Sequence, residues 1–173
     1  VVSIFVNPLQ FDETQDFESY PRPHDADQRL LAAAGVDVVF VPKVSEMYPN
    51  GKNFTVQEDA LSRELCGAHR PGHFTGVLTV VLKLLQIAAA DRAYFGEKDY
   101  QQLQLVRGMV AAFFIETEIV GCPTVREPDG LALSSRNTRL SPAERELAAQ
   151  FSAILQTAPN TDKAQQQLSA KGF

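Results

Sequence analysis

The sequence predicts an α/β fold built on a doubly wound parallel sheet. Two observations support this class: short runs of β-branched and aromatic residues with almost no polar interruption, and longer segments with helical periodicity between them. Continuous apolar strands are typical of parallel sheets that are covered on both faces. Successive units of strand, helix and strand connect through right-handed crossovers.

Length and composition limit the classes of function. The 173 residues suit one domain with a substantial core, because 45% are hydrophobic and 21% are charged. The net charge of −5 offers no basic field, so we expect neither nucleic acid nor a membrane as a partner. The apolar stretch 77–90 is interrupted by polar residues and predicts no membrane span. Cys66 and Cys122 lack a paired-cysteine motif, which favours reduced thiols and a cytoplasmic location.

The first predicted strand covers residues 1–6, and Asn7 and Pro8 end it. Gln10 lies just beyond that end. It would project into the crevice where parallel sheets place their ligands, and an ordinary loop residue is the alternative.

A helix is predicted over 25–34, stopped by Gly35, and a second strand over 36–41. Asp25 and Asp27 lie near the start of this helix. They would either favour its positive end or reach a magnesium ion through water.

Residues 66–74 combine a cysteine, two histidines and an arginine. Cys66, His69 and His73 have spacings that zinc could use, but a structural zinc site needs four ligands, so we do not expect metal here. Pro71 and Gly72 break the helix, which would let Arg70 and His73 lean over a cleft. A packed or solvent-facing His73 is the alternative.

The other elements follow from the same signals. Ser141 and Glu144 have the spacing of a capping box and Pro142 takes the first helical position, which predicts a helix from there to about residue 156. The remaining expectations are a turn at 48–51, a short strand at 54–56, a helical turn at 61–65, a core helix at 77–90, strands at 91–96 and 117–120, and a final helix at 162–170.

The strand at 91–96 runs through one glycine into a helix with a polar start, Gly96-Glu97-Lys98-Asp99. The first backbone N–H groups of a helix lack internal partners and attract phosphate, and Lys98 adds a full charge. Gln102 lies within one turn of Lys98 and Asp99. An ordinary surface turn is the alternative. The apolar stripe expected to pack this helix inward is Leu103, Val106, Val110 and Phe113.

A second polar group follows a tight turn at 126–130. Ser134, Ser135, Arg136 and Arg139 gather in a short span of an otherwise acidic protein. Hydroxyls and guanidinium groups commonly hold phosphates, and a solvated loop is the alternative.

Four segments in this order resemble the pantoate–β-alanine ligase family: 5–11, 70–74, 96–102 and 131–137. The resemblance covers residue 1 to about residue 152. It implies a Rossmann-like fold of the nucleotidyltransferase superfamily type, with an ATP- and pantoate-binding domain at 1–152 and a linker with the start of a carboxyl-terminal domain at 153–173.

The family's reaction has two steps. A pantoate carboxylate attacks the α-phosphorus of ATP and releases pyrophosphate, and the amine of β-alanine then displaces AMP to give pantothenate. The resemblance implies three small-molecule substrates, Mg²⁺ with the ATP and a homodimer.

The resemblance also implies the roles of particular residues. Lys98 would contact the phosphates and Asp99 the ribose, within an ATP site that comprises Gly96, Glu97, Lys98, Asp99, Val125, Leu133, Ser134, Ser135 and Arg136. Lys98, Ser134, Ser135 and Arg136 would be the catalytic members of that site, and Asp27 is a weak candidate for magnesium. Gln10 and Gln102 would bind the acid, with Asn7, Tyr20, Arg70 and His73 around the same pocket.

One feature of the family falls outside this sequence. Its opening strand and helix carry a His-x-Gly-His motif that stabilises the reacting phosphate, and the sequence begins after that place. None of His24, His69 and His73 replaces it. We therefore expect a chain without the family's first strand and most of its small carboxyl-terminal domain. A nucleotidyltransferase with a different acceptor and a module that binds without turnover are the alternative functions.

Overall fold

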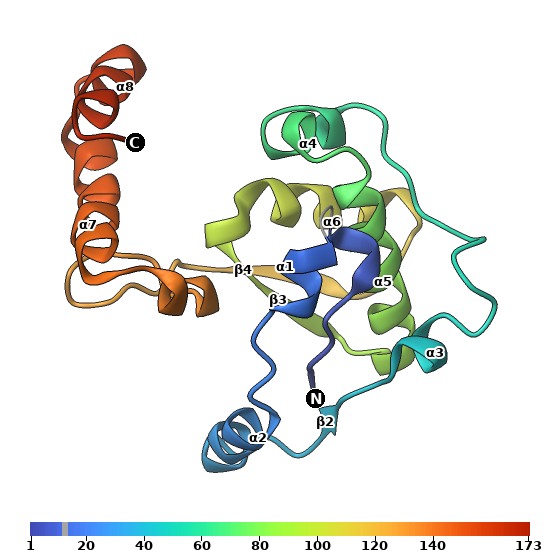
Figure 1. The fold of residues 1–173 in the computed structure, drawn as a ribbon. Coiled ribbons are helices and arrows are strands. Elements are labelled where there is room, and N and C mark those ends of the chain that lie inside the picture. Colours follow the sequence, from blue (N-terminus) through green and yellow to red (C-terminus); the bar gives the residue numbers. More distant parts are fainter. Residues whose placement is uncertain (12–13) are drawn as a thin grey trace. The chain divides into compact units, whose positions relative to one another are not determined.

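A computed structural model describes residues 1–11 and 14–173 of the chain, which divide into two compact units, 1–122 and 123–173 (Figure 1). The predicted boundary at residue 152 falls within a helix of the second unit and stays a prediction. The first unit contains β1 (Val2–Ser3), η1 (Pro8–Gln10), α1 (Thr14–Glu18), α2 (His24–Ala33), β2 (Val39–Phe40), α3 (Val44–Met47), η2 (Leu61–Arg63), α4 (Cys66–His69), α5 (His73–Ala88), β3 (Arg92–Gly96), η3 (Glu97–Asp99), α6 (Tyr100–Ala112) and β4 (Glu118–Cys122), where η marks a 3-10 helix. The second contains η4 (Ser135–Arg139), α7 (Pro142–Thr157) and α8 (Thr161–Ala170).

The strands pair in parallel, as the sequence predicts. β1 pairs with β2 with Val2 opposite Val39, and β3 pairs with β4 with Phe95 opposite Gly121. Helices connect the paired strands, which is the arrangement that parallel pairing requires. β1 is shorter than the predicted 1–6, because β2 offers only a two-residue partner.

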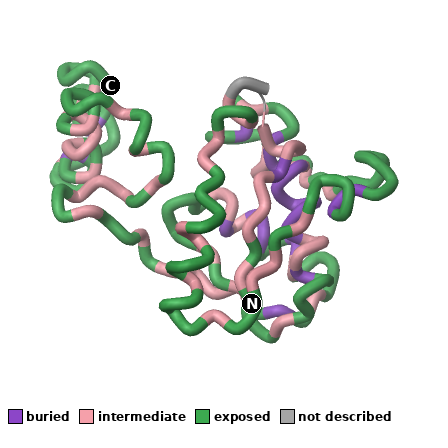
Figure 2. Tube along the Cα trace, turned by 60° about the horizontal axis from the view of Figure 1, so that its bottom comes forward, coloured by how far each residue is buried: buried purple, intermediate pink, exposed green. Residues whose placement is uncertain are grey.

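The core of the first unit forms around α5 and α6, whose inward sides carry most of the buried residues (Figure 2). Val77, Val80 and Val81 on α5 are buried as predicted, as are Leu103 and Val106 on α6. Phe113 is different. It is 56% exposed because it is the C-cap residue of α6, where the helical period ends, and Met109 takes the inward position one turn earlier.

The α5 helix begins at His73, four residues before the predicted start. Gly72, in the left-handed region at φ 83°, precedes it directly. The helix includes Gly76, where a Cβ would lie 2.3 Å from the carbonyl oxygen of Leu9, so the missing side chain lets η1 lie directly against α5. None of the helices in residues 1–11 and 14–173 is long and apolar enough to cross a membrane.

The predicted strand at 54–56 is wrong. Phe54 is exposed, and the backbone N–H of Val56 donates to Thr79 Oγ1 at 2.9 Å instead of to a strand. The hydroxyl of a helical residue thus replaces the sheet partner that the sequence pattern suggested.

The second unit confirms the predicted capping box. Ser141 Oγ accepts from the backbone N–H of Glu144 at 3.3 Å, and Glu144 Oε2 accepts from that of Ser141 at 2.8 Å. Pro142 takes the first helical position of α7, and α8 packs against that helix. The local signals for this helix start are therefore sufficient to locate it.

Candidate active site

Gln10 lies in η1 and is held there through its backbone carbonyl. That oxygen is 2.7 Å from His73 Nδ1 and 3.1 Å from Arg70 Nη2. Both partners flank Gly72, the glycine that redirects the chain into α5. Three residues predicted to surround the acid are thus joined directly, although Gln10 and His73 are far apart in the sequence.

The hydrogen bonds of His73 identify its tautomer. A carbonyl oxygen only accepts, so Nδ1 carries the hydrogen that faces Gln10. Nε2 lies 3.3 Å from Arg70 Nη1, and a guanidinium only donates, so Nε2 accepts. The ring is therefore the neutral Nδ1–H tautomer, and it orients the arginine beside it.

Asn7 is the most buried residue of this cluster, with 2% of its surface exposed. Its Nδ2 donates to the carbonyl of Gly76 at 3.0 Å and to Gln10 Oε1 at 3.2 Å. Its Oδ1 accepts from the backbone N–H of Leu9 at 3.3 Å and from Tyr48 Oη at 2.7 Å. Burial raises the pKa of Tyr48 to about 12, so the phenol is a donor at neutral pH.

Tyr20 reaches the same region through an aromatic contact. Its ring packs edge-on against Phe11, the residue after Gln10, with 5.5 Å between the ring centroids. Four of the six residues predicted for the acid are therefore joined by hydrogen bonds, and Tyr20 contacts the residue next to Gln10.

The sixth residue, Gln102, lies in the first turn of α6. Lys98 and Asp99 precede it in η3; both are exposed, with 3.5 Å between Nζ and Oδ1. The side chain of Asp99 makes no capping hydrogen bond to α6, which follows η3 directly. Since α5 contacts both η1 and α6, the two glutamines lie on elements packed against the same helix.

Gln101, next to Gln102, binds residues 61–66 with both the nitrogen and the oxygen of its side-chain amide. Its Nε2 donates to the carbonyls of Leu61 and Glu64, both at 2.8 Å, and its Oε1 accepts from the N–H of Cys66 at 3.1 Å. This clamp fixes the start of α6 against residues 61–66.

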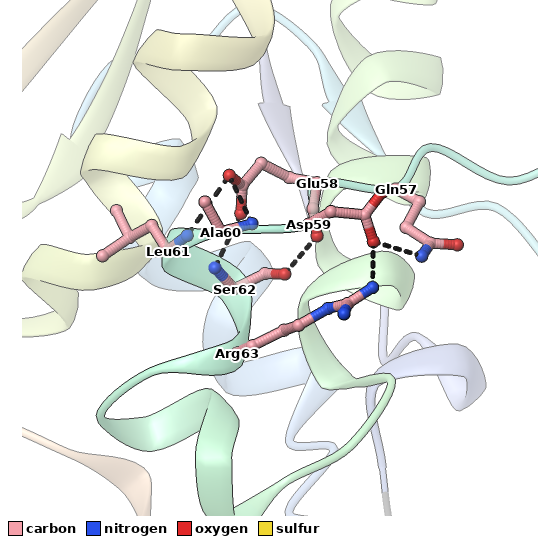
Figure 3. A network of polar contacts seen from close by, with 7 residues as sticks. All are labelled: Gln57, Glu58, Asp59, Ala60, Leu61, Ser62 and Arg63. Atoms are coloured by element: carbon pink, nitrogen blue, oxygen red, sulfur yellow. Dashed lines mark hydrogen bonds and ion pairs between the residues drawn. The ribbon is translucent and has the colours of Figure 1, made fainter.

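The loop before the clamp has its own polar network (Figure 3). Glu58 accepts from three consecutive backbone N–H groups, those of Ala60, Leu61 and Ser62, at 3.0, 3.2 and 2.7 Å. The bond from Ser62 contributes most to lowering the pKa of Glu58. The carboxylate thereby starts η2 and shapes the segment that Gln101 binds.

The second unit contains the other predicted nucleotide residues. Val125 and Leu133 are exposed and lie side by side, because the N–H of Leu133 donates to the carbonyl of Val125 at 3.0 Å. Ser134 then caps η4 by accepting from the N–H of Arg136 at 3.2 Å, and Ser135 and Arg136 are exposed. The approach of this set to Lys98 in the first unit stays a prediction.

The structure offers limited support for a protein-held metal ion. Across residues 1–11 and 14–173, no three His, Cys, Asp or Glu side chains are grouped as ligands. Asp27 is partly buried in the first turn of α2, where it also suits the positive end of the helix. A single carboxylate fits a magnesium ion that is bound mainly by phosphate and water.

Sequence reasoning missed three residues of the site: Tyr48, Gly76 and Gln101. Gly76 had a signal, since a glycine inside an apolar helix commonly marks a close approach. Tyr48 was assigned only to a turn, and Gln101 only to a polar helix start. Their partners lie 35 or more residues away in sequence, so no local pattern identifies them.

A sequence model of the family described as Pantoate-beta-alanine ligase matches residues 1–172. The chain belongs to this family. It is 58% identical over 155 residues to Pantothenate synthetase of Mycobacterium ulcerans (strain Agy99), a match that covers 90% of the chain and 49% of that relative. The chain thus spans about half the length of this member of the pantoate–β-alanine ligase family.

Two solved structures of the family are similar to the chain. Pantothenate Synthetase from Thermus thermophilus matches with a TM-score of 0.92 and 47% identity, over 97% of this chain and 65% of that one. Pantoate-beta-alanine Ligase from Francisella tularensis, complexed with Beta-gamma ATP and Beta-alanine, matches with a TM-score of 0.91 and 43% identity, over 99% of this chain and 67% of that one. These likenesses confirm the predicted α/β fold with parallel strands, of the Rossmann-like nucleotidyltransferase type.

Proposed function

We propose that the protein carrying this chain condenses pantoate with β-alanine at the expense of ATP. A carboxylate oxygen of pantoate attacks the α-phosphorus, and the bond from that phosphorus to pyrophosphate breaks. The amine of β-alanine then attacks the acyl carbon of pantoyl adenylate, AMP leaves and the nitrogen loses a proton. The observation that carries the proposal is the hydrogen-bonded cluster of Asn7, Gln10, Arg70 and His73, four residues from two segments that resemble the family.

Gln10 and Gln102 bind the hydroxyls and carboxylate of pantoate. A neutral amide holds the carboxylate without the direct charge of a cation, so the oxygen keeps its nucleophilicity. Catalysis in such a step consists mainly of in-line positioning and neutralisation of charge. The packing of η1 and α6 against α5 supports the assignment of both glutamines to one pocket.

The nucleotide lies at the start of α6, with the phosphates on Lys98 and the ribose on Asp99. Ser134, Ser135 and Arg136 cover the triphosphate, and Val125 and Leu133 contact the adenine. The exposure of Lys98 and the uncapped start of α6 support this arrangement, as does the Francisella tularensis relative complexed with Beta-gamma ATP.

Magnesium is expected to accompany the ATP, with Asp27 as the protein group that binds it through water. Such an ion neutralises phosphate charge when bound. We further propose a cytoplasmic homodimer. The free thiols of Cys66 and Cys122 are consistent with a reducing compartment, and light scattering tests the dimer.

The assay is formation of pantothenate and AMP from pantoate, β-alanine and ATP. Gln102→Ala is expected to lower pantoate-dependent release of pyrophosphate by about tenfold or more, because one or two hydrogen bonds to a charged group are lost. Unchanged release would refute the pantoate assignment. Release that depends on another acceptor would favour a different nucleotidyltransferase, and binding without turnover would favour a binding module.

A further inference from the structure

Two main-chain groups fix the direction of the Asn7 amide. The N–H of Leu9 can only donate, and it lies 3.3 Å from Oδ1. The carbonyl of Gly76 can only accept, and it lies 3.0 Å from Nδ2. A reversed amide would place donor against donor at one end and acceptor against acceptor at the other, in a buried position where unmade hydrogen bonds are costly. Only one orientation is compatible with the fold.

The contacts of Asn7 with Tyr48 and with Gln10 follow the same assignment of donors and acceptors. The Tyr48 hydroxyl faces Oδ1 at 2.7 Å, so it donates. Nδ2 faces Gln10 Oε1 at 3.2 Å, so that oxygen accepts. The orientation of Gln10 follows from these contacts: its oxygen is turned toward Asn7, and Nε2 is the end of the amide that does not take part in this contact.

We propose that Tyr48 and Asn7 are positioning residues that make Gln10 present its Nε2, as a donor, to the acid substrate. The inference rests on the proposed function, in which Gln10 binds pantoate. A carboxylate has only acceptor atoms, so it distinguishes the two ends of an amide. Tyr48 acts through Asn7, because its hydroxyl donates to the same Oδ1 as the N–H of Leu9 and so strengthens the hold on this orientation. Its phenol is protonated at neutral pH, and burial raises its pKa to about 12.

The relay from Tyr48 through Asn7 to Gln10 can be tested without any ligand. In the ¹⁵N-labelled chain, Tyr48→Phe keeps the ring and removes only the donor hydroxyl. We expect the side-chain amide resonances of Asn7 and Gln10 to shift, and the Asn7 amide protons to exchange about tenfold faster, which corresponds to one lost hydrogen bond. Tyr94→Phe, at an exposed strand residue, is the matched control. Asn7 and Gln10 resonances that stay in place in Tyr48→Phe would overturn the relay.

The effect on the substrate is tested in the protein that forms pantothenate. Tyr48→Phe is expected to raise KM for pantoate about five- to tenfold while KM for ATP changes less than about twofold, since only the acid contact is misaligned. An equal rise in both KM values, or no rise, would contradict the proposal. If the wild type forms no pantothenate, the proposed function fails together with the substrate half of this inference, and the amide spectra still decide the relay.

A second variant distinguishes a reversed Gln10 amide from a loss of binding that affects every ligand. Asn7→Asp places an oxygen opposite both Gln10 Oε1 and the carbonyl of Gly76, so we expect the fold to lose stability and the Gln10 amide to reverse and face the substrate with Oε1. We expect pantoate affinity to fall about tenfold or more while affinity for pantoamide, which has an NH₂ group in place of one carboxylate oxygen, falls less or rises. Equal losses for the two ligands would refute the proposed orientation.

Discussion

A methyl group at position 76 would collide with the turn that carries Gln10. The Cβ would lie 2.3 Å from the oxygen of Leu9 and 2.8 Å from the nitrogen of Gln10, both of them backbone atoms. Backbone cannot move aside as a flexible side chain can. The close contact between α5 and η1 therefore depends on a residue without a side chain.

We predict that Gly76→Ala destabilises the protein by about 1–3 kcal/mol, the usual cost of overpacking, and weakens pantoate binding because η1 is displaced. Urea unfolding and calorimetry measure the two effects. The control is Gly108→Ala on α6, where a Cβ meets nothing within 4 Å and alanine is expected to stabilise the helix by about 0.5–1 kcal/mol. Equal stability changes in the two variants would contradict this account.

Glu58 gives a prediction for the dependence of stability on pH. Its pKa is lowered in the folded chain, chiefly by the backbone N–H of Ser62, from an ordinary value of 4.5. A lowered carboxyl pKa stabilises the fold at pH values above 4.5, and this contribution is lost as the pH falls through the folded pKa. Glu58→Gln should therefore be less stable than the wild type at pH 7, with a difference that shrinks below about pH 4.5. Thermal unfolding across pH 3–7 measures it, and a constant difference would exclude the charge effect.

At the scale of elements, the start of α6 is tied to a loop that precedes α5. The amide of Gln101 bonds to three backbone groups between Leu61 and Cys66. The carbonyls of Leu61 and Glu64 also accept backbone N–H groups, so Gln101 adds to the hydrogen bonds that hold this segment and gives the N–H of Cys66 its acceptor. Gln102, the next residue, therefore lies on a helix end that is held in place.

Gln101→Ala is expected to release residues 61–66. Hydrogen exchange at the Cys66 amide should accelerate about tenfold or more, because its acceptor is removed. Gln104→Ala makes the same change of side chain three residues further along α6 and serves as the control. If both variants exchange alike, the clamp has no separate role.

The element boundaries show where local sequence is sufficient. The capping box at Ser141 is confirmed, because all of its determinants lie within four residues. The start of α5 lies four residues before the predicted one, at His73 directly after Gly72, because the apolar period begins later than the helix itself. Phe113 was expected inside, because a periodic pattern does not reveal that the helix has ended at its C-cap.

At the scale of the molecule, the predicted ATP site draws on both units. Lys98 belongs to residues 1–122, and Arg136 belongs to residues 123–173. Each cation is exposed, and neither unit contains the whole set of predicted nucleotide residues. If the two sets bind one triphosphate, each contributes separately to affinity.

We therefore predict that Lys98→Ala and Arg136→Ala each weaken ATP binding by about 10- to 100-fold, the worth of a charged hydrogen bond. Calorimetric titration of ATP measures both. Arg139→Ala removes an equal charge from the same turn, η4, and should change the affinity less. An effect of Lys98→Ala alone would leave the second unit outside the nucleotide site.

The fold class and the positions of all four main strands could be predicted from the sequence, since apolar runs and helical periods alternate along it. The cluster around Gln10 was foreseen as a set of residues but not as a network. Asn7, Tyr48 and Gly76 meet only because η1 packs on α5 and the residue after α3 reaches Asn7, and no spacing in the chain encodes that meeting.

The direction of the Asn7 side chain has a consequence for redesign of the pocket. The atoms that impose it belong to the main chain at Leu9 and Gly76, so they persist whatever side chains are exchanged there. A glutamine kept at position 10 therefore continues to turn its oxygen toward Asn7 and to leave Nε2 for the ligand. Conversion of this pocket to recognise a carboxamide has to begin at position 7, whose side chain faces Gln10.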